Sequence, residues 1–359
     1  MSVLFVGNGI NRYARIVPGW DELFAKAINI DGFQVQQSLT PTLEYELNVR
    51  NALNQDKTKT ADDIKKGIAA YLTQMQNEAS IGWDQKIHVP LLNCAPHTIL
   101  TTNYDYFLER AANPDFKAGS SSTKEWLYSK ERYRDVPNHR IHHIHGEISV
   151  PTSICLGYEH YIGSIQYIRA ELTRRTSEKG TPFDGGASKS KKTFHIHDVL
   201  AGLDAPVNNR WYYHFFTDDI YILGFGLDPS EQDIWWLLNY RAELMRKFPG
   251  LITNTITYLE TDSEYDAAPI NRTFEEVLNI CISTASEKTK RDALDSFGHY
   301  NVRKKLLTQK RAQLEAFNVN VSDCTALADF EKSYIDNKIN WDQVYTLRYE
   351  RALNVLKGM

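Results

Sequence analysis

Three histidines within one short segment are the side chains of this sequence best suited to chemistry. The segment RIHHIHGEIS (140–149) contains His142, His143 and His145, and a glycine follows the last of them. Histidine can bind a metal, exchange a proton near neutral pH, or pack within a core. If the segment is a strand, His143 and His145 share one face and His142 lies on the other. His145 then stands at the end of the strand, directly before a turn.

A metal site is the less favoured interpretation of these histidines. A His-x-His pair supplies two ligands, whereas closed metal sites need four. Glu147, Glu159 and His160 are only loose candidates for the others. No CxxC pair occurs among the four cysteines, which are Cys94, Cys155, Cys281 and Cys324. We therefore expect neither a zinc ribbon nor another metal, and we expect His145 to be the reactive histidine on a strand built by its neighbours.

Four apolar segments have the pattern of buried strands, and each ends in glycine or short polar residues. They are SVLFVG (2–7), HTILT (97–101), RIHHIHG (140–146) and DIYILGFG (219–226). Helical patterns lie between and after them, as in PSEQDIWWLLNYRAELMRK (229–247). This alternation predicts an α/β fold, a Rossmann-like parallel sheet with helices on both faces. Ligands of such sheets bind at the carboxyl ends of the strands, so these four ends are the expected site.

Two glycine-rich turns follow predicted strands and could bind a ligand. Gly7, Asn8 and Gly9 could bring backbone N–H groups close to a phosphate, or could simply form a tight turn. The ordinary dinucleotide fingerprint GxGxxG fails here, because Arg12 stands where its last glycine would be. The later turn GFGLD (224–228) suits close approach to a ribose or phosphate.

The segment TTNYD places two polar side chains just after a predicted strand. Asn103 can donate and accept hydrogen bonds to a ribose, and Asp105 can accept one from a hydroxyl or an amide. Asp105 could equally cap the helix that follows. Both roles can hold at once, since the two side chains could do different jobs.

Composition and charge exclude several classes of protein. The 359 residues carry a formal net charge of −4, which gives no general attraction for nucleic acid or acidic lipids. No apolar run is long enough to span a membrane, and the N-terminus lacks the pattern of a secretory signal. We expect a cytoplasmic protein that binds neither membranes nor nucleic acid directly.

The chain is expected to contain two parts. Residues 1–264 contain the strand–helix alternation, and within them 176–194, rich in Gly, Ser and Lys, is the expected mobile loop. Residues 265–359 have mostly helical patterns and are the expected place for contacts with other copies or partners.

The order of these motifs resembles the sirtuin-like fold, and in particular the bacterial sirtuin-like NADases of antiphage defence. VGNGINR, TTNYD, HIHG and GFGLD are similar to that family's successive motifs, and together they cover roughly residues 1–262. The first motif departs from the family pattern, because Asn8 stands where alanine is usual. The four-cysteine zinc ribbon of the protein-deacylase sirtuins is also missing.

The resemblance implies a role for each motif. It places catalysis on Asn103 and His145, with NAD as the substrate. The residues it assigns to binding NAD are Gly7, Asn8 and Gly9 near the pyrophosphate, Asp105 near the nicotinamide ribose, Gly224, Phe225 and Gly226 on the adenosine side, Glu260 near the adenine, and Arg12 and Thr102 at no particular part of NAD.

The function implied by the resemblance is NAD glycohydrolysis, which releases nicotinamide and ADP-ribose. The missing zinc ribbon favours this over peptide deacylation, which stays the less favoured alternative. A catalytically silent module that senses NAD or ADP-ribose is the other alternative. An NAD hydrolase that depletes NAD during infection would need control, so we expect a homo-oligomer and a second regulatory protein, such as an NTPase or a nucleotide-sensing partner.

Overall fold

The computed structural model describes most of the chain as two compact units. The described residues are 1–13, 23, 40–79, 86–118, 128, 131–173, 196–202, 210–262, 283, 286–326, 329 and 340–358. The units are Met1–Thr255 and Ile256–Met359. They divide before the strand at 256–260, ahead of the predicted boundary after residue 264, because this strand pairs with a later strand of the second unit. The predicted mobile loop 176–194 lies outside the described residues.

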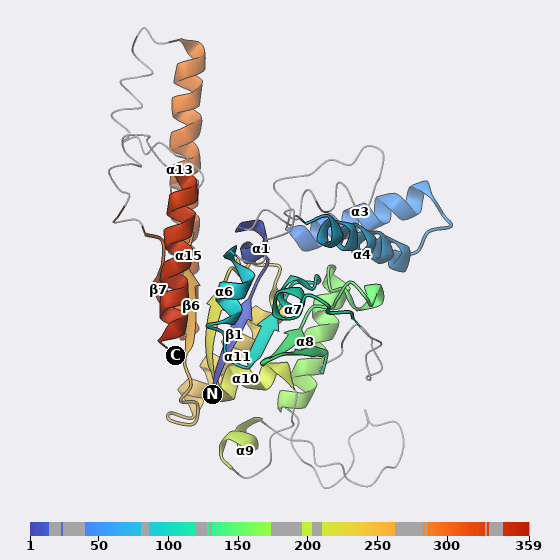
Figure 1. The fold of residues 1–359 in the computed structure, drawn as a ribbon, viewed down its shortest axis with the longest axis vertical. Helices are drawn as coiled ribbons and strands as arrows, with labels where there is room; N and C mark the ends of the chain where they lie inside the picture. The colour runs from blue at the N-terminus through green and yellow to red at the C-terminus, as the bar shows by residue number, and fades with distance from the viewer. Residues whose placement is uncertain are drawn as a thin grey trace. The chain divides into compact units, whose positions relative to one another are not determined.

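Seven strands form a mostly parallel sheet with helices around it, which confirms the predicted Rossmann-like α/β fold (Figure 1). Their order is β3-β4-β2-β1-β5-β6-β7. The strands of the first unit are β1 (Ser2–Val6), β2 (Thr98–Thr101), β3 (Tyr133–Val136), β4 (His139–His143) and β5 (Asp219–Leu223). Strand β1 pairs in parallel with β2 and β5, β2 in parallel with β4, and β3 is antiparallel to β4. The carboxyl ends of β1, β2, β4 and β5 therefore share one edge of the sheet.

The central strands are buried because their sequences are apolar on both faces. Val3, Leu4, Phe5 and Val6 of β1 are at most 1% exposed, as parallel strands covered on both sides require. The helices of the first unit are α1 (Gly9–Tyr13), α3 (Pro41–Gln55), α4 (Ala61–Glu78), α6 (His88–Leu92), α7 (Phe107–Ala112), α8 (Tyr158–Thr173), α9 (Ile196–Leu200), α10 (His214–Thr217) and α11 (Gln232–Lys247), with 3-10 turns η1 (Pro151–Ser153) and η2 (Trp211–Tyr213).

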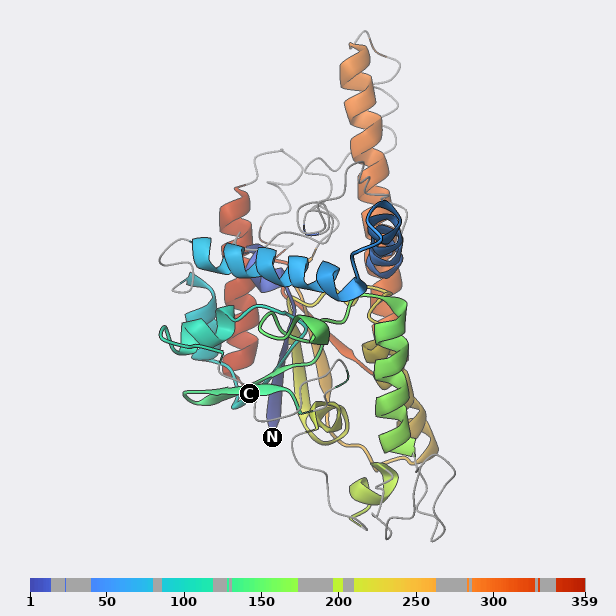
Figure 2. The same ribbon diagram turned by 90° about the vertical axis from the view of Figure 1, so that its right-hand side faces the viewer.

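Helices α3 and α4 pack on the loops that follow β2 and β4. Both helices lie toward the end of β1 that continues into α1 (Figures 1 and 2). Helix α4 begins with a capping box, in which Thr60 and Asp63 satisfy each other's backbone N–H groups. Apolar side chains of the two helices share a core with the two loops; its members include Tyr45, Val49, Ile64, Ile68, Leu72, Tyr104, Tyr106, Ile148 and Ile154. This core holds the chain in place on either side of the predicted site residues.

The second unit combines two strands with long helices. Strands β6 (Ile256–Glu260) and β7 (Asn320–Asp323) pair in parallel, and the helices are α13 (Glu287–Ala316) and α15 (Trp341–Lys357). The sequence patterns predicted helix here and missed β7, a short strand with only partly buried side chains. Within the described residues, none of the helices combines the length and apolar character that crossing a bilayer demands.

Candidate functional site

Hydrogen bonds link the four strand ends into a closed ring. The N–H of Gly9 donates to the carbonyl of Gly224 at 2.7 Å, which joins the loops after β1 and β5. Asn11 Nδ2 of α1 donates to Asp105 Oδ2 at 2.9 Å, which joins β1 to the loop after β2. The other two links run from β2 to β4 and from β4 to α11. The structure therefore brings the predicted motifs together at one edge of the sheet.

Asn103 and His145 are neighbours because β2 and β4 run in register. Thr101 pairs with His143, so Asn103 and His145 each lie two residues beyond the last paired position. His143 Nδ1 donates to the carbonyl of Asn103 at 2.8 Å, and the N–H of Ile144 donates to the carbonyl of Thr101 at 2.9 Å. These bonds hold the two exit segments side by side.

His145 lies between two carboxylates from the start of α11. Its Nε2 is 3.1 and 3.2 Å from the two carboxylate oxygens of Asp233, and its Nδ1 is 3.4 Å from Glu231 Oε2. The His145 side chain is buried, as are both acids. The ring of Tyr161 from α8 meets the imidazole edge-on, with 5.3 Å between the ring centroids.

The two carboxylates change the protonation of His145. Burial disfavours the imidazolium, but the charges of Asp233 and Glu231 outweigh burial and raise the pKa of His145 above its ordinary value. Burial also raises the pKa of Glu231 to about 7, although the positive charge of His145 opposes the increase. Glu231 therefore exchanges a proton near neutral pH, the range in which acid–base catalysis is effective, directly beside a histidine whose protonated form is favoured.

Asn103 presents a buried oxygen that is free to bind a ligand. Its side chain is 6% exposed, and its Oδ1 has no hydrogen-bond partner among the described residues. The backbone N–H of Asn103 donates to Thr101 Oγ1 at 3.0 Å, so the backbone is held while the side-chain oxygen is not. Buried polar atoms normally have a partner, and a hydroxyl donor from a ligand would supply one here.

Asp105 is held by a hydrogen-bonded chain of polar side chains that begins at His88. His88 Nε2 donates to Asn11 Oδ1 at 2.8 Å, and Asn11 in turn donates to Asp105. The N–H of Phe107 donates to Asp105 Oδ1 at 3.2 Å, but the N-cap of α7 is Tyr106, so Asp105 lies one residue before the cap position suggested for it. Burial raises the pKa of Asp105 to about 6. The hydrogen bond from Phe107 favours the charged carboxylate and opposes this increase.

The glycines of the first motif are required by close packing of two loops. A Cβ on Gly7 would lie 2.4 Å from Phe225 Cα, and a Cβ on Gly9 would lie 2.5 Å from the Gly224 carbonyl oxygen. Their N–H groups donate to the carbonyls of Leu223 and Gly224, so in this structure both donors are already used. Binding of a phosphate by this turn stays a prediction.

The other predicted binding residues occupy different environments. Arg12 and Gly226 are exposed, and Asn8 and Thr102 are half-buried. The ring of Phe225 packs on Phe5 with 4.8 Å between centroids, so its side chain belongs to the core. Glu260 ends β6 in the second unit, where Arg311 pairs with its carboxylate. Roles for these residues in binding NAD stay predictions.

His142 and His143 have structural contacts. His143 Nε2 lies 2.7 Å from Glu109 Oε1; burial opposes a charge on His143, but Glu109 outweighs it and raises the pKa of His143 to about 9. His142 packs against Tyr133 and His214, and burial lowers the pKa of His142 to about 3. His143 is therefore a buried cation and His142 is neutral. Both have contacts within the fold, as their predicted structural role requires.

Gly146 is predicted to be intolerant of any side chain. Its φ is +101°, and a Cβ would lie 2.2 Å from the carbonyl oxygen of Ser153. We expect Gly146→Ala to lower the free energy of unfolding by at least about 1–3 kcal/mol, the cost of such backbone strain before the clash is added. Urea unfolding measures this. Gly226→Ala is the control, because its Cβ would meet nothing within 4 Å, and an equal loss there would contradict the prediction.

Sequence reasoning missed the acids that surround His145 and the amide that supports Asp105. Asp233 and Glu231 lie in the SEQD segment after the second glycine turn, at the start of the predicted helix 229–247, where an acidic residue is explained equally well by the helix dipole. Together with His145 they bring three donor atoms within 4.8 Å of one another, a spacing that is compatible with a small cation. The loosely suggested ligands Glu147 and His160 have other partners, Arg134 for the first and the N–H groups of Leu156 and Gly157 for the second.

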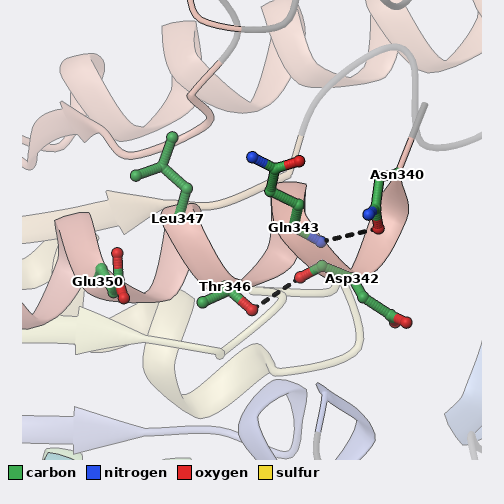
Figure 3. A pocket seen from close by; sticks show the side chains of 6 residues that line it. All are labelled: Asn340, Asp342, Gln343, Thr346, Leu347 and Glu350. Atoms are coloured by element: carbon green, nitrogen blue, oxygen red, sulfur yellow. Dashed lines mark hydrogen bonds between the residues drawn. The ribbon is translucent and has the colours of Figure 1, made fainter. Parts of the chain in front are cut away.

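The second unit has a surface depression whose lining includes none of these residues. Side chains of Asn340, Asp342, Gln343, Thr346, Leu347 and Glu350 line it, all on or just before α15 (Figure 3). Asn340 caps the helix by accepting from the N–H of Gln343, and Thr346 Oγ1 donates to the carbonyl of Asp342. Two of its polar side chains, those of Asn340 and Thr346, are thus engaged within the helix itself.

The fold and site define an α/β protein with a polar cluster at the carboxyl edge of a Rossmann-like sheet. A family model described as a SIR2-like domain matches residues 97–190, which include Asn103, Asp105 and His145. This match covers less than half of the chain and supports a sirtuin-like family for it. The search of curated proteins found no match.

Proposed function

We propose that this protein is an NAD glycohydrolase that cleaves the bond between nicotinamide and ribose. The observation that carries the proposal is the pairing of Asn103 and His145 at adjacent strand ends, within the segment that matches a SIR2-like domain. Asn103 offers a buried oxygen without a partner among the described residues, and His145 offers a titratable ring between two acids.

The charge of the His145 cluster suits this reaction. Loss of neutral nicotinamide from NAD leaves positive charge on the ribose, and the leaving group needs no strong acid. When Asp233 and Glu231 are both ionised, the cluster keeps a net negative charge even if His145 is protonated. A fixed negative charge in a buried site stabilises a developing positive charge far more than it would in water.

Asn103 and His145 would have different roles in binding the ribose and activating the water. The free oxygen of Asn103 can accept a hydrogen bond from a ribose hydroxyl or from the attacking water. His145 can accept a proton from that water or from a hydroxyl, with Glu231 close enough to share it. The cysteines of this chain have no CxxC spacing for a zinc ribbon, which favours hydrolysis over deacylation of a peptide.

The test is product analysis with the purified full chain. We expect nicotinamide and ADP-ribose to form from NAD in the absence of any acyl-lysine peptide, in the presence of EDTA, and far more slowly with Asn103→Ala. Release that requires the peptide would instead indicate a deacylase. Binding of NAD by calorimetry without turnover under any condition would indicate a sensor, and no binding would remove the NAD assignment.

The biological role is proposed on the resemblance in sequence. Depletion of NAD during infection would stop phage growth at the expense of the host cell, so the activity has to be held off until it is needed. We propose control through self-assembly or through a second regulatory protein. Removal of residues 265–359 from the chain is expected to disturb assembly or control; if it alters neither, the C-terminal part has another role.

A further inference from the structure

We propose that Asp233 positions His145 and determines which ring nitrogen faces the substrate. This inference rests on the proposed function of the site. Both oxygens of the Asp233 carboxylate lie within 3.2 Å of His145 Nε2, and the sequence distance between the two residues is 88 positions. Such a contact exists only through the fold.

Asp233 is itself held from two helices. The N–H of Ile234, on the same first turn of α11, donates to Oδ1 at 2.9 Å. Ser164 Oγ, on α8, donates to Oδ2 at 3.1 Å. The Asp233 side chain is 0% exposed, so water does not compete for these bonds. A carboxylate anchored at both oxygens is a rigid support for the ring that it contacts.

The contact with Asp233 assigns different tasks to the two nitrogens of His145. A carboxylate accepts, so Nε2 carries the proton that it binds, and in the neutral ring the lone pair lies on Nδ1. Nδ1 is 3.4 Å from Glu231 Oε2, longer than an ordinary hydrogen bond. Nδ1 is therefore the nitrogen that takes a proton from water or a ribose hydroxyl, and Glu231 is the adjacent group that can receive it.

Several charged or titratable groups surround this pair, and each bears on its protonation. They are Glu231 beside Asp233, Arg132 near β3, Tyr161 on α8, and Cys155 and Tyr104 in the loops after β4 and β2. Asp233 is the one among them that binds the imidazole at hydrogen-bond distance through both oxygens. Removal of the charge of Asp233 alone should therefore have the largest effect on the pKa of His145.

A purely structural role for Asp233 is the competing explanation. An acid in the first turn of a helix interacts favourably with the helix dipole, and Asp233 could matter for folding only. Asp233→Asn separates the two explanations, because asparagine keeps the size and can still accept from His145 Nε2. Asp218→Asn is the matched control, since Asp218 also binds a histidine, His214, at 2.9 Å but precedes β5 at the opposite end of that strand.

The experiment measures His145 directly and then the reaction. The first readout is the pKa and tautomer of His145 by 15N NMR in the full chain without NAD, with His145→Gln used to assign the signal. The second is the pH profile of kcat and kcat/KM for nicotinamide release. For Asp233→Asn we expect a lower pKa of His145, a kcat about 10²-fold lower with KM little changed, and an acid limb of kcat/KM that moves to lower pH. Asp218→Asn is expected to change neither readout.

The outcomes separate this inference from the proposed function. An unchanged pKa and tautomer of His145 in folded Asp233→Asn overturns the inference, whatever the activity. If the wild-type chain never releases nicotinamide, the proposed function fails, and the NMR comparison still decides the role of Asp233. If Asp233→Asn does not fold, Ser164→Ala removes one anchor of Asp233 and must lower kcat without raising KM; an unchanged kcat there overturns the inference.

Discussion

Replacement of His145 by alanine is expected to lower kcat for nicotinamide release by about 10²- to 10⁴-fold, the range for loss of a positioned general acid or base. The variant loses the group that exchanges a proton with the substrate. It also leaves Asp233 and Glu231 without the imidazole that lies between their carboxylates. Steady-state rates from pH 5 to 9 measure the loss.

A surface histidine provides the control for this prediction. His197 lies 3.3 Å from Asp198 and both side chains are about one-third exposed, so His197→Ala removes a histidine–carboxylate contact outside the site. Its kcat is expected to equal that of the wild type. Unfolding curves for both variants show whether the chain is folded under assay conditions. A folded His145→Ala variant that keeps more than a tenth of the wild-type kcat would contradict the assignment of His145.

Replacement of Glu147 by alanine is expected to lower the free energy of unfolding by about 3–5 kcal/mol, the usual cost of removing one partner from a buried ion pair. Glu147 is 0% exposed and accepts two hydrogen bonds from Arg134, at 2.7 and 2.8 Å. Tyr106 OH donates to the same carboxylate at 2.7 Å. The variant leaves Arg134, and Arg132 at 3.9 Å, without their buried counter-charge.

The pH dependence of this loss has a definite sign. Burial opposes ionisation of Glu147, but His143, Arg134 and Tyr106 outweigh it and hold the pKa of Glu147 below its ordinary value. Such an acid contributes stability above its unfolded-state pKa, near 4.3, and loses that contribution as pH falls through the folded-state value. The difference between wild type and Glu147→Ala should be complete at pH 7 and should shrink below pH 4.

Glu243→Ala is the matched control for Glu147→Ala. Glu243 pairs with Lys247 one helical turn away, and both side chains are about half exposed. Its removal is expected to cost at most about 0.5 kcal/mol. Chemical denaturation of both variants at pH 7 and at about pH 3 gives the comparison. Equal losses for the buried and the exposed glutamate would refute the proposed importance of the Glu147 network.

Local patterns in the sequence were sufficient for the fold and for its main strands, although β4 ends at His143 and leaves His145 in the segment after it. Apolar runs such as VLFV in β1 define buried parallel strands, because both faces of such strands must be covered. Parallel strands place their carboxyl ends at one edge, so Asn103 and His145 could be expected to meet from their positions alone. The periodicity does not reveal β7, which has few residues and little burial.

The environment of these residues was decided by the tertiary structure. Asp233 reaches His145 across 88 residues, and Asn11 reaches Asp105 across 94, through crossovers whose packing no local pattern describes. The same holds for Gly7 and Gly9. Their sequence suggests a turn that binds phosphate, whereas in the structure the absence of a Cβ lets the loop at Gly224 approach closely. Residue type and order determined where chemistry could occur; the protonation and orientation of His145 depend on burial and on charges brought from distant segments, which arise only when the chain folds.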